Sequence, residues 1–369
     1  MDETVVFCRS LEPWRTAAGL GESAMPEARR WRLARSQGLD RVLAWQIIGR
    51  SGGSWSERSR ARARRLLAAA AASEEVQRQA LIELVEALRT SGVDLLLMKG
   101  AAWAYQAYDS PALRPRMDAD VLIRRSDRRR VAAALAELGY QAQPENLADL
   151  ATAQGHFVKR DRWQRDQFLD VHWRVTNPLV YADALPFERV WARSTRIDAL
   201  GGARGFCAID ALLHACLHRL AHHGGGSSAI WVYDVHQLSR RMDRGGWDEV
   251  VREAIVNRLC GACFHGLSRS AELFGTEVPA SVLEQLAAGK RPEEEAFAGR
   301  RISALGMLVS DWRALDTWSA RLRLLGAHLF PGREYMRSKY GTGHPLALPL
   351  LYAYRTLAGL PRWLAGLRR

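Results

Sequence analysis

Strand-like sequence is confined to one stretch near the middle of the chain, and helical sequence lies on both sides of it. Short apolar or alternating runs at residues 93–98, 118–123, 155–159 and 167–173 suit β-strands, and a polar turn joins the last two as an antiparallel hairpin. Elsewhere, hydrophobic residues recur mostly at three- and four-residue steps, which is the period of helices. Because so small a sheet needs helices to cover it, we predict an α+β fold.

This pattern divides the chain into four parts. Residues 1–25 have no clear period and end in a Gly/Ser-containing stretch, which predicts a flexible arm. Residues 26–92 follow a helical pattern, residues 93–200 contain the predicted strands, and residues 201–369 are helical almost to the end. We therefore expect an N-terminal helical region, a small mixed-sheet core and a mostly α-helical C-terminal domain.

The bulk composition is that of an ordinary globular protein, with 48% hydrophobic and 25% charged residues in 369. The first residues lack a basic segment followed by an apolar run, and no run of about 18 uncharged apolar residues is present. Five cysteines spread over a long chain are typical of reduced thiols. We therefore expect a cytoplasmic protein without a membrane span.

The net charge of +13 and the pI near 10.0 suit a polyanionic partner: a nucleotide, a nucleic acid or an acidic membrane. Only four of the basic residues are lysines, and such a preference for arginine also follows from base composition. Nucleic acid is therefore an alternative partner and not the favoured one. Residues 346–369 combine apolar residues with arginines, as a membrane-surface helix does, but Pro349 and Pro361 interrupt them. A terminal helix packed on the rest of the protein is the favoured interpretation.

Paired carboxylates are the most informative feature of the predicted strands. Asp118 and Asp120 are two residues apart, so both side chains lie on one face of their strand. Carboxylates this close repel each other unless a cation lies between them, and Mg²⁺ is the usual cation in phosphoryl-transfer sites. Asp170, on the strand 167–173, would supply a third carboxylate for two Mg²⁺ ions, with Mn²⁺ as the other candidate. The alternative is a solvent-exposed strand edge with incidental acids.

Upstream of these acids lies a candidate phosphate site. Lys99 and Gly100 follow a predicted strand and open a helix, whose first N–H groups favour anions. The Lys99 ammonium suits a β- or γ-phosphate, and Arg114 and Arg116 could bind the same triphosphate.

Three further residues are secondary candidates for a pocket or a base. His172 shares a strand face with Asp170. His218 lies on a predicted helix with His214 and His222 at four-residue spacing, which predicts either pocket lining or ordinary helix packing. Asp234 could act as a general base for an acceptor hydroxyl, or form a salt bridge to an arginine.

The order of these motifs resembles the DNA-polymerase-beta-like nucleotidyltransferase superfamily, and more specifically an uncharacterised bacterial nucleotidyltransferase family. The shared motifs are Leu96–Gly100, Tyr108, Arg114-Pro115, Asp118–Leu122, Asp170–Trp173, Leu213–His218 and Trp231–Asp234. The chain departs from the superfamily pattern at Ala101, where a second Gly or Ser is usual, and in a longer gap between Gly100 and Asp118. The first departure concerns how phosphate is held.

The resemblance implies a nucleotidyltransferase mixed sheet and transfer of a nucleoside monophosphate from a nucleoside triphosphate such as ATP. The acceptor would be a hydroxyl or phosphate of a small molecule, peptide or protein, for example in tailoring a natural product. Asp118 and Asp120 would then hold both metal ions and Asp170 the ion on the nucleophile's side. The alternatives are a toxin-like enzyme that modifies tRNA, and a catalytically idle module that binds nucleotide or serves as a scaffold.

Overall fold

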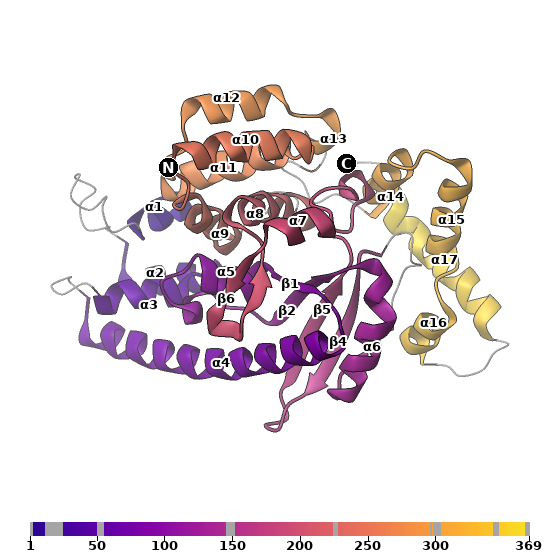
Figure 1. The fold of residues 1–369 in the computed structure, drawn as a ribbon, viewed down its shortest axis with the longest axis horizontal. Helices are drawn as coiled ribbons and strands as arrows, with labels where there is room; N and C mark the ends of the chain where they lie inside the picture. Colours follow the sequence, from indigo (N-terminus) through magenta and orange to yellow (C-terminus); the bar gives the residue numbers. More distant parts are fainter. Residues whose placement is uncertain are drawn as a thin grey trace.

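A seven-stranded sheet with helices packed around it forms the centre of the protein (Figure 1). The structure, a computed structural model, describes residues 3–11, 25–49, 55–144, 152–223, 228–295, 297, 304–341 and 347–365. The α+β fold expected from the sequence is confirmed. Within these ranges no helix is both long and apolar enough to cross a bilayer, and all five cysteines are free thiols.

Four helices are described before the first strand: α1 (Glu3–Ser10), α2 (Glu27–Ser36), α3 (Asp40–Gly49) and α4 (Glu57–Thr90). Ser56 caps α4 by accepting a hydrogen bond from the N–H of Ser59 at 3.3 Å. Gly92 adopts φ +68° just beyond the end of α4, in the left-handed conformation common after the end of a helix. Figure 1 shows α4 running along one side of the sheet, so the N-terminal region reaches the strands that carry the acids.

The expectation of a loose arm at residues 1–25 is wrong for the residues of α1. Val5, Phe7 and Cys8 are buried in the main core, where α1 packs against the C-terminal helices. An apolar run this short fills less than the window in which a helical period can be recognised. Residues 12–24 lie outside the described residues.

The sheet has the order β3-β4-β5-β2-β1-β7-β6. Its strands are β1 (Leu95–Met98), β2 (Asp118–Ile123), β3 (Gln141–Ala142), β4 (Gln154–Arg160), β5 (Asp166–His172), β6 (Thr195–Ile197) and β7 (Ala203–Gly205). β4 and β5 form the predicted antiparallel hairpin, and β2 pairs antiparallel with β1 and parallel with β5. The strands β3, β6 and β7 were not predicted, because two or three residues cannot show an alternating pattern.

Among the described residues, three helices and several short 3₁₀ segments connect the strands. Helix α5 (Lys99–Gln106) follows β1 without a loop, and α6 (Arg128–Glu137) follows β2. Ser126 lies in the 3₁₀ turn before α6, and Asp127 is the residue that directly precedes the helix. Helix α7 (Phe187–Arg193) lies between β5 and β6.

The C-terminal half is helical, as expected. Its helices are α8 (Ala208–His223), α9 (Ala229–Ser239), α10 (Arg244–Val256), α11 (Cys260–Phe274), α12 (Ala280–Ala288), α13 (Pro292–Glu295), α14 (Ala304–Arg313), α15 (Trp318–Leu329), α16 (Arg333–Tyr340) and α17 (Ala347–Ala365). α17 continues through Pro349, which lies in its first turn where no N–H donor is needed.

One large hydrophobic core links the N-terminal helices, the sheet and helices α8–α12. A second, much smaller cluster is centred on Leu308 and Leu324 of α14 and α15. Figure 1 draws α14–α17 together at one end of the molecule. The domain boundaries expected at residues 92 and 200 stay predictions.

Candidate active site

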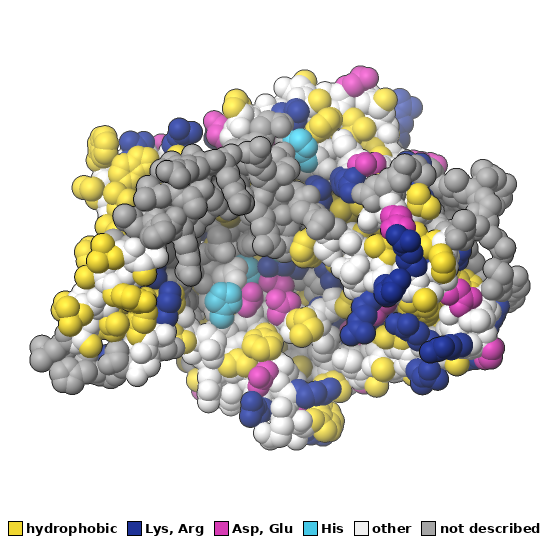
Figure 2. Space-filling view, turned by 180° about the vertical axis from the view of Figure 1, so that it is seen from behind, with side chains coloured by type: hydrophobic (Ala, Val, Ile, Leu, Met, Phe, Trp, Pro, Cys, Tyr) yellow, Lys and Arg dark blue, Asp and Glu magenta, His cyan; other side chains and the backbone are white. Residues whose placement is uncertain are grey.

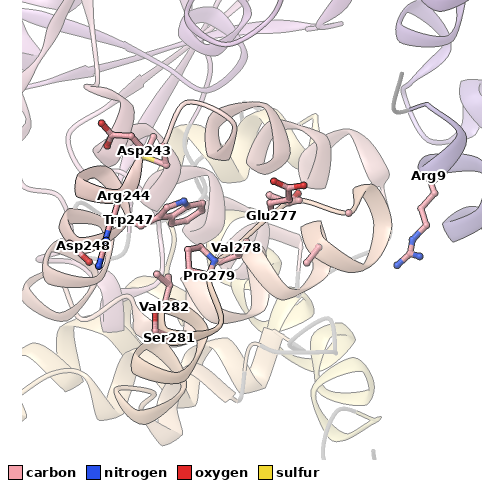
Figure 3. A pocket seen from close by; sticks show the side chains of 14 residues that line it. Arg9, Asp243, Arg244, Trp247, Asp248, Glu277, Val278, Pro279, Ser281 and Val282 are labelled. Carbon is pink, nitrogen blue, oxygen red and sulfur yellow. The ribbon is translucent and has the colours of Figure 1, made fainter. Parts of the chain in front are cut away.

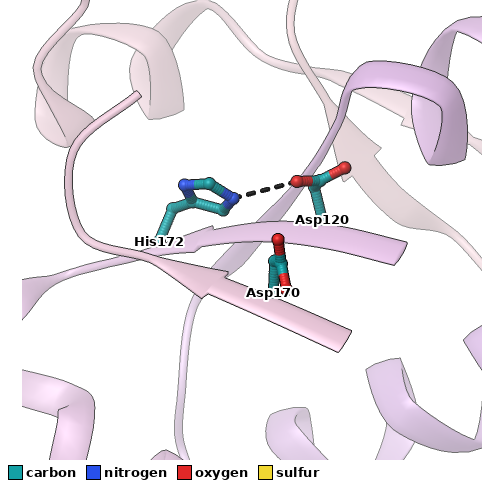
Figure 4. A group of neighbouring side chains, drawn as sticks. All are labelled: Asp120, Asp170 and His172. Carbon is teal, nitrogen blue, oxygen red and sulfur yellow. Dashed lines mark hydrogen bonds and ion pairs between the residues drawn. The ribbon is translucent and has the colours of Figure 1, made fainter. Parts of the chain in front are cut away.

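The parallel pairing of β2 with β5 brings two predicted carboxylates side by side. Asp120 lies opposite Asp170 in the register, and Leu122 lies opposite His172. Ligand atoms of Asp120, Asp170 and His172 lie within 4.8 Å of one another. Figure 4 shows the two carboxylates on adjacent strands, with the imidazole ring beside Asp120. This is the group of His, Cys, Asp and Glu side chains, among the described residues, whose spacing suits a metal ion.

Asp120 is the buried centre of the group. Its Oδ1 accepts hydrogen bonds from Lys99 Nζ at 2.6 Å and from His172 Nε2 at 2.9 Å. Burial raises the pKa of Asp120, but the Lys99 charge and the His172 hydrogen bond outweigh it and hold that pKa well below its usual range. Burial and the nearby Lys99 ammonium lower the pKa of His172, so the ring is neutral at pH 7. Asp120 is therefore a fixed, ionised carboxylate.

Asp170 is held from the hairpin partner β4. His156 Nδ1 donates to Asp170 Oδ1 at 2.7 Å, and Gln154 Nε2 donates to Oδ2 at 3.2 Å. These two donors fix the orientation of the carboxylate toward Asp120. Gln154 was not predicted to belong to the site, because it lies just before the predicted strand 155–159. In the observed strand β4 it is two residues before His156 and shares a face with it.

Asp118 lies at the exposed start of β2 and is not part of the 4.8 Å group. Partial burial and the charges of Asp120 and Asp170 raise the pKa of Asp118, against the opposing effect of Lys99. The negative charges of Asp120 and Asp170 therefore repel the ionised form of the Asp118 carboxyl group. The expected set of three acids is present on one sheet face, with Asp120 and Asp170 closest and Asp118 at the rim.

The turn between β1 and α5 has an unusual backbone. Lys99 adopts φ +48°, a left-handed conformation that is uncommon for a residue with a side chain. Such conformations cost about 1–3 kcal/mol and cluster at functional sites. Here the conformation lets β1 pass directly into α5 while the Lys99 side chain reaches Asp120. Gly100 is buried at the first turn of α5, next to the expected phosphate-facing N–H groups.

The Arg114 side chain packs against this turn at Gly100. Its guanidinium binds Asp234 of α9 with two hydrogen bonds, of 2.7 and 2.8 Å, and the hydroxyl of Tyr108 donates to the same carboxylate at 2.6 Å. Although burial lowers the pKa of Arg114, Asp234 and Tyr108 outweigh it and raise that pKa. A Cβ added to Gly100 would lie 3.8 Å from the Arg114 Cζ, so the arginine packs against the turn.

Arg116 forms a second buried pair of the same kind. Its Nη2 donates to Glu74 of α4 at 2.8 Å, and Tyr105 of α5 donates to the same Glu74 oxygen. The Arg116 Cβ lies 3.4 Å from where a Cβ on Gly100 would be. Each arginine that precedes Asp118 is thus joined to one carboxylate and one tyrosine.

These ion pairs differ from the roles that the sequence predicted for the two arginines. Arg114 and Arg116, expected on the triphosphate, lie in buried ion pairs, and Asp234, weighed as a base or as a salt-bridge partner, is the partner of Arg114. Glu74 was not singled out. Glu74 is seven residues before Leu81 and fourteen before Leu88, so it lies on the same, buried face of α4. An acid on the apolar face of a predicted helix is the sequence feature that could have identified it.

His218 does not join the carboxylates. It lies on α8, with its ring centroid 6.4 Å from that of His214, and His214 packs against Trp103 and Phe206. Neither histidine belongs to the 4.8 Å group. The side chain of His222 lies outside the described residues.

Acidic and histidine side chains gather in a hollow of the face drawn in Figure 2. A different pocket, of about 960 Å³, lies between the α9–α10 and α11–α12 connections and is lined by Trp247, Thr276 and Val282 among others (Figure 3). It contains no residue of the carboxylate group.

The donor set of the site fits a divalent cation. Carboxylate oxygens on neighbouring strands are the ligands that Mg²⁺ and Mn²⁺ prefer. Because a neutral His172 donates its Nε2 proton to Asp120, that nitrogen serves to orient the carboxylate. If a cation binds here, Asp120 and Asp170 would be its ligands, and Asp118 is the further carboxylate that would join them.

The chain has similarities to known proteins. The model of a family described as uncharacterised nucleotidyltransferases matches residues 25–275. No curated protein matches the sequence. Among solved structures, an antigenic nucleotidyltransferase-like protein from Paracoccidioides brasiliensis is similar, with 12% identity, 56% of this chain and 95% of that chain covered, and a TM-score of 0.34. JHP933 from Helicobacter pylori has 13% identity, 61% and 91% coverage, and a TM-score of 0.30.

The family match spans more than half of the chain and includes β1, β2 and β5 with the carboxylates and Lys99. The chain therefore belongs to this family of uncharacterised nucleotidyltransferases.

Proposed function

We propose that this protein transfers a nucleoside monophosphate from a nucleoside triphosphate to an acceptor hydroxyl or phosphate, with Mg²⁺ as the metal. The observation that carries the proposal is the meeting of Asp120 and Asp170 on adjacent parallel strands beside Lys99. A catalytically idle binding module has no need to keep two clustered carboxylates so close, because their mutual repulsion would destabilise the fold.

In this proposal the acids bind metal ions, and Lys99 with the first turn of α5 binds phosphate. Asp120, Asp170 and Asp118 would hold the divalent cations, which when bound supply charge neutralisation and activation of the attacking oxygen. Lys99 lies at the first turn of α5, so its ammonium and the N–H groups of that turn can bind phosphate oxygens. Binding a triphosphate there would require Lys99 to share its bond to Asp120.

We assign Arg114 and Arg116 to the support of the phosphate-binding turn. Both guanidinium groups are buried and joined to carboxylates, and both lie against Gly100. Holding the turn rigid places its N–H groups before substrate arrives, which is how catalysis by positioning and preorganised charge works. His172 serves the same end at Asp120, and His156 at Asp170.

The acceptor is expected on the β4–β5 side of the carboxylates, opposite α5. Phe168 is half exposed there, on the face that carries Asp170 and directly opposite Asp118 in the register. A small molecule, peptide or protein remains the favoured acceptor class. tRNA is the alternative, supported by the net charge of +13, and it predicts binding that weakens steeply with salt.

Transfer of label tests the proposal. The protein is incubated with each α-³²P-labelled nucleoside triphosphate, Mg²⁺ or Mn²⁺, and cell extract, and label in macromolecules and small molecules is separated. Asp120→Asn should reduce transfer at least about 100-fold, because charge stabilisation at the reacting phosphate is the largest catalytic contribution. Asp166→Asn is the matched control, since this exposed acid lies on the same strand as Asp170 and bonds Arg160. It should transfer label like the wild type.

Titration with Mn²⁺, followed by its electron paramagnetic resonance signal, separates metal binding from catalysis. Asp120→Asn and Asp170→Asn should weaken Mn²⁺ binding, and Asp166→Asn should not. Metal binding without transfer to any acceptor, in extract from any source tried, would favour the idle module. Transfer that survives Asp120→Asn would refute the assigned site.

A further inference from the structure

The C-terminal helices expose a group of large apolar side chains. They are Trp318, Leu322, Phe330, Leu350, Tyr354 and Leu357, each between 61% and 74% exposed. Figure 2 shows hydrophobic side chains gathered on the side of the molecule where α14–α17 lie. Scattered apolar residues on a surface are normal, but a group confined to α15, the residue that follows it and α17 indicates an interaction surface.

Within each of the two helices, the exposed residues follow the helical period and so lie on one face of that helix. On α17, Leu350, Tyr354 and Leu357 are spaced at i, i+4 and i+7, and on α15 Trp318 and Leu322 are at i and i+4. The opposite face of α17 is the packed one: Leu348 is buried, and the Tyr352 hydroxyl donates to the Pro331 carbonyl at 2.8 Å. Packing within the protein therefore covers one face of α17, and the apolar residues of the other face stay exposed.

Both interpretations drawn from the sequence for residues 346–369 are relevant here. A terminal helix packed on the protein was favoured over a membrane-surface helix. Helix α17 is packed on one face, through Phe330 and Tyr352 with their rings 5.7 Å apart, and exposes apolar residues on the other.

The charge of this region identifies the kind of surface that would cover the apolar face. Residues 304–369 contain ten arginines and lysines against three acids, which is a net +7 in a chain of net +13. A second copy of the same face would bring +7 against +7, so self-association is opposed by repulsion. An anionic lipid surface offers both an apolar layer and negative charge.

The types of residue fit a bilayer interface. Trp318 and Tyr354 belong to the two residue types enriched at the level of lipid headgroups. Arg321 and Arg323 on α15 place cations beside its exposed apolar residues, where basic groups are attracted to an anionic membrane. Arg355 lies on the packed side of α17, where it donates to the His328 carbonyl at 3.4 Å. No described helix can span a bilayer, so the geometry is that of helices lying on the surface.

We propose that the exposed face of α15 and α17, with Phe330, is a docking surface for anionic lipid membranes. The apolar side chains enter the headgroup region and the arginines bind lipid phosphates. This inference is independent of the proposed transferase activity, because none of these residues contacts the carboxylate group.

Co-sedimentation of the full-length chain with vesicles tests this proposal. Vesicles of phosphatidylcholine alone are compared with vesicles containing phosphatidylglycerol at about 30%, at low and high salt. Binding should be at least about ten-fold stronger to the anionic vesicles and should weaken with salt. The triple variant Leu350→Ser/Tyr354→Ser/Leu357→Ser should lose at least about ten-fold of this binding.

A matched control removes three exposed apolar residues elsewhere. Trp45→Ser/Ile255→Ser/Val256→Ser changes side chains of 45%, 56% and 52% exposure on α3 and α10. It should bind vesicles like the wild type. Circular dichroism and thermal unfolding check that both variants are folded, so a loss of binding is not a loss of structure.

Three outcomes would overturn the proposal. If the wild-type protein does not bind anionic vesicles, this face is not a lipid-binding surface. The same conclusion follows if the triple variant binds them as well as the wild type does. A dimer in sedimentation velocity that the triple variant converts to monomer, without vesicle binding, would assign the face to a second copy. A folded monomer that binds no vesicles would leave an acidic protein as the partner.

Discussion

The two ends of the chain are both strongly basic, but they use their apolar residues differently. Residues 26–65 contain eleven arginines against three acids, a net +8, and residues 304–369 carry a net +7. In α2 and α3 apolar side chains such as Trp31 and Ile47 are buried in the main core, although Trp45 and Ile48 of α3 are exposed. In α15 and α17 the comparable side chains are exposed, above a small separate cluster. Equal charge therefore does not indicate an equal role.

The difference extends to the active site. Helix α4 lies inside the family-matched range and contributes Glu74 to the buried pair with Arg116. Helices α14–α17 lie beyond residue 275, outside that range, and none of their residues belongs to the carboxylate group. We infer that the N-terminal helices support catalysis, whereas the C-terminal helices add a function of their own.

The largest expected effect is that of Glu74→Ala. Removing this carboxylate leaves Arg116 as a buried charge without its partner, which costs about 3–5 kcal/mol. The turn at Lys99 and Gly100 would also lose its support, so the KM for nucleoside triphosphate should rise in the surviving folded protein. Urea unfolding and transfer kinetics measure the two effects.

Glu75→Ala is the matched control for this prediction. Glu75 is the next residue of α4, but it is exposed and pairs with Arg78 on the surface, where ion pairs are worth about 0–1 kcal/mol. Equal losses of stability for the two variants would show that the buried pair has no special role, and that α4 is no more a part of the site than α15 is.

A pair of identical substitutions comes next in size. Leu84→Ala in α4 and Leu324→Ala in α15 remove side chains that are 1% and 0% exposed. A truncation of this kind costs about 2–5 kcal/mol, less where the surroundings can collapse. Because Leu324 belongs to a cluster of two buried leucines and Leu84 to the main core, Leu84→Ala should be the more destabilising. The opposite order, in urea unfolding, would contradict the division into a main core and a small one.

Tyr108→Phe tests a single hydrogen bond of the other buried pair. The hydroxyl donates to Asp234 at 2.6 Å, and removing it should cost about 1.5–3 kcal/mol of stability, as for hydrogen bonds to charged groups. Arg114 keeps its two bonds to Asp234, so the turn should survive and kcat should change little. If Tyr108→Phe lost as much activity as Asp120→Asn, Tyr108 would have to act on the substrate itself and not only through Asp234.

Local pattern in the sequence was enough to predict the strands that carry the carboxylates. The alternation around Asp118 and Asp120 predicts β2 with its observed bounds, and the turn before Gln167 predicts the β4–β5 hairpin. The pairing of Asp120 with Asp170 was expected because acids on neighbouring strands share a face. The part of the predicted site that the structure brings together therefore depends on short-range periodicity and on one strand pairing.

The partners of the arginines could not be obtained in this way. Arg116 meets Glu74 across 42 residues and Arg114 meets Asp234 across 120, and those contacts depend on how α4 and α9 pack against the sheet. A single sequence shows that a buried acid exists in α4 but does not give the cation that neutralises it. The exposed face of α17 stayed an unfavoured alternative for the same reason, since its sequence pattern fits a packed helix equally well.

The smallest expected effect is on the stability of the C-terminal surface. Leu357→Ser changes a side chain that is 69% exposed, and surface substitutions of this kind alter stability by about 0.5 kcal/mol or less. Transfer activity in solution should also be unchanged, while binding to anionic vesicles should fall. A loss of more than about 1 kcal/mol in thermal or urea unfolding would mean that the protein itself covers Leu357 in solution. The two basic ends of the chain would then resemble each other, both with their apolar residues buried.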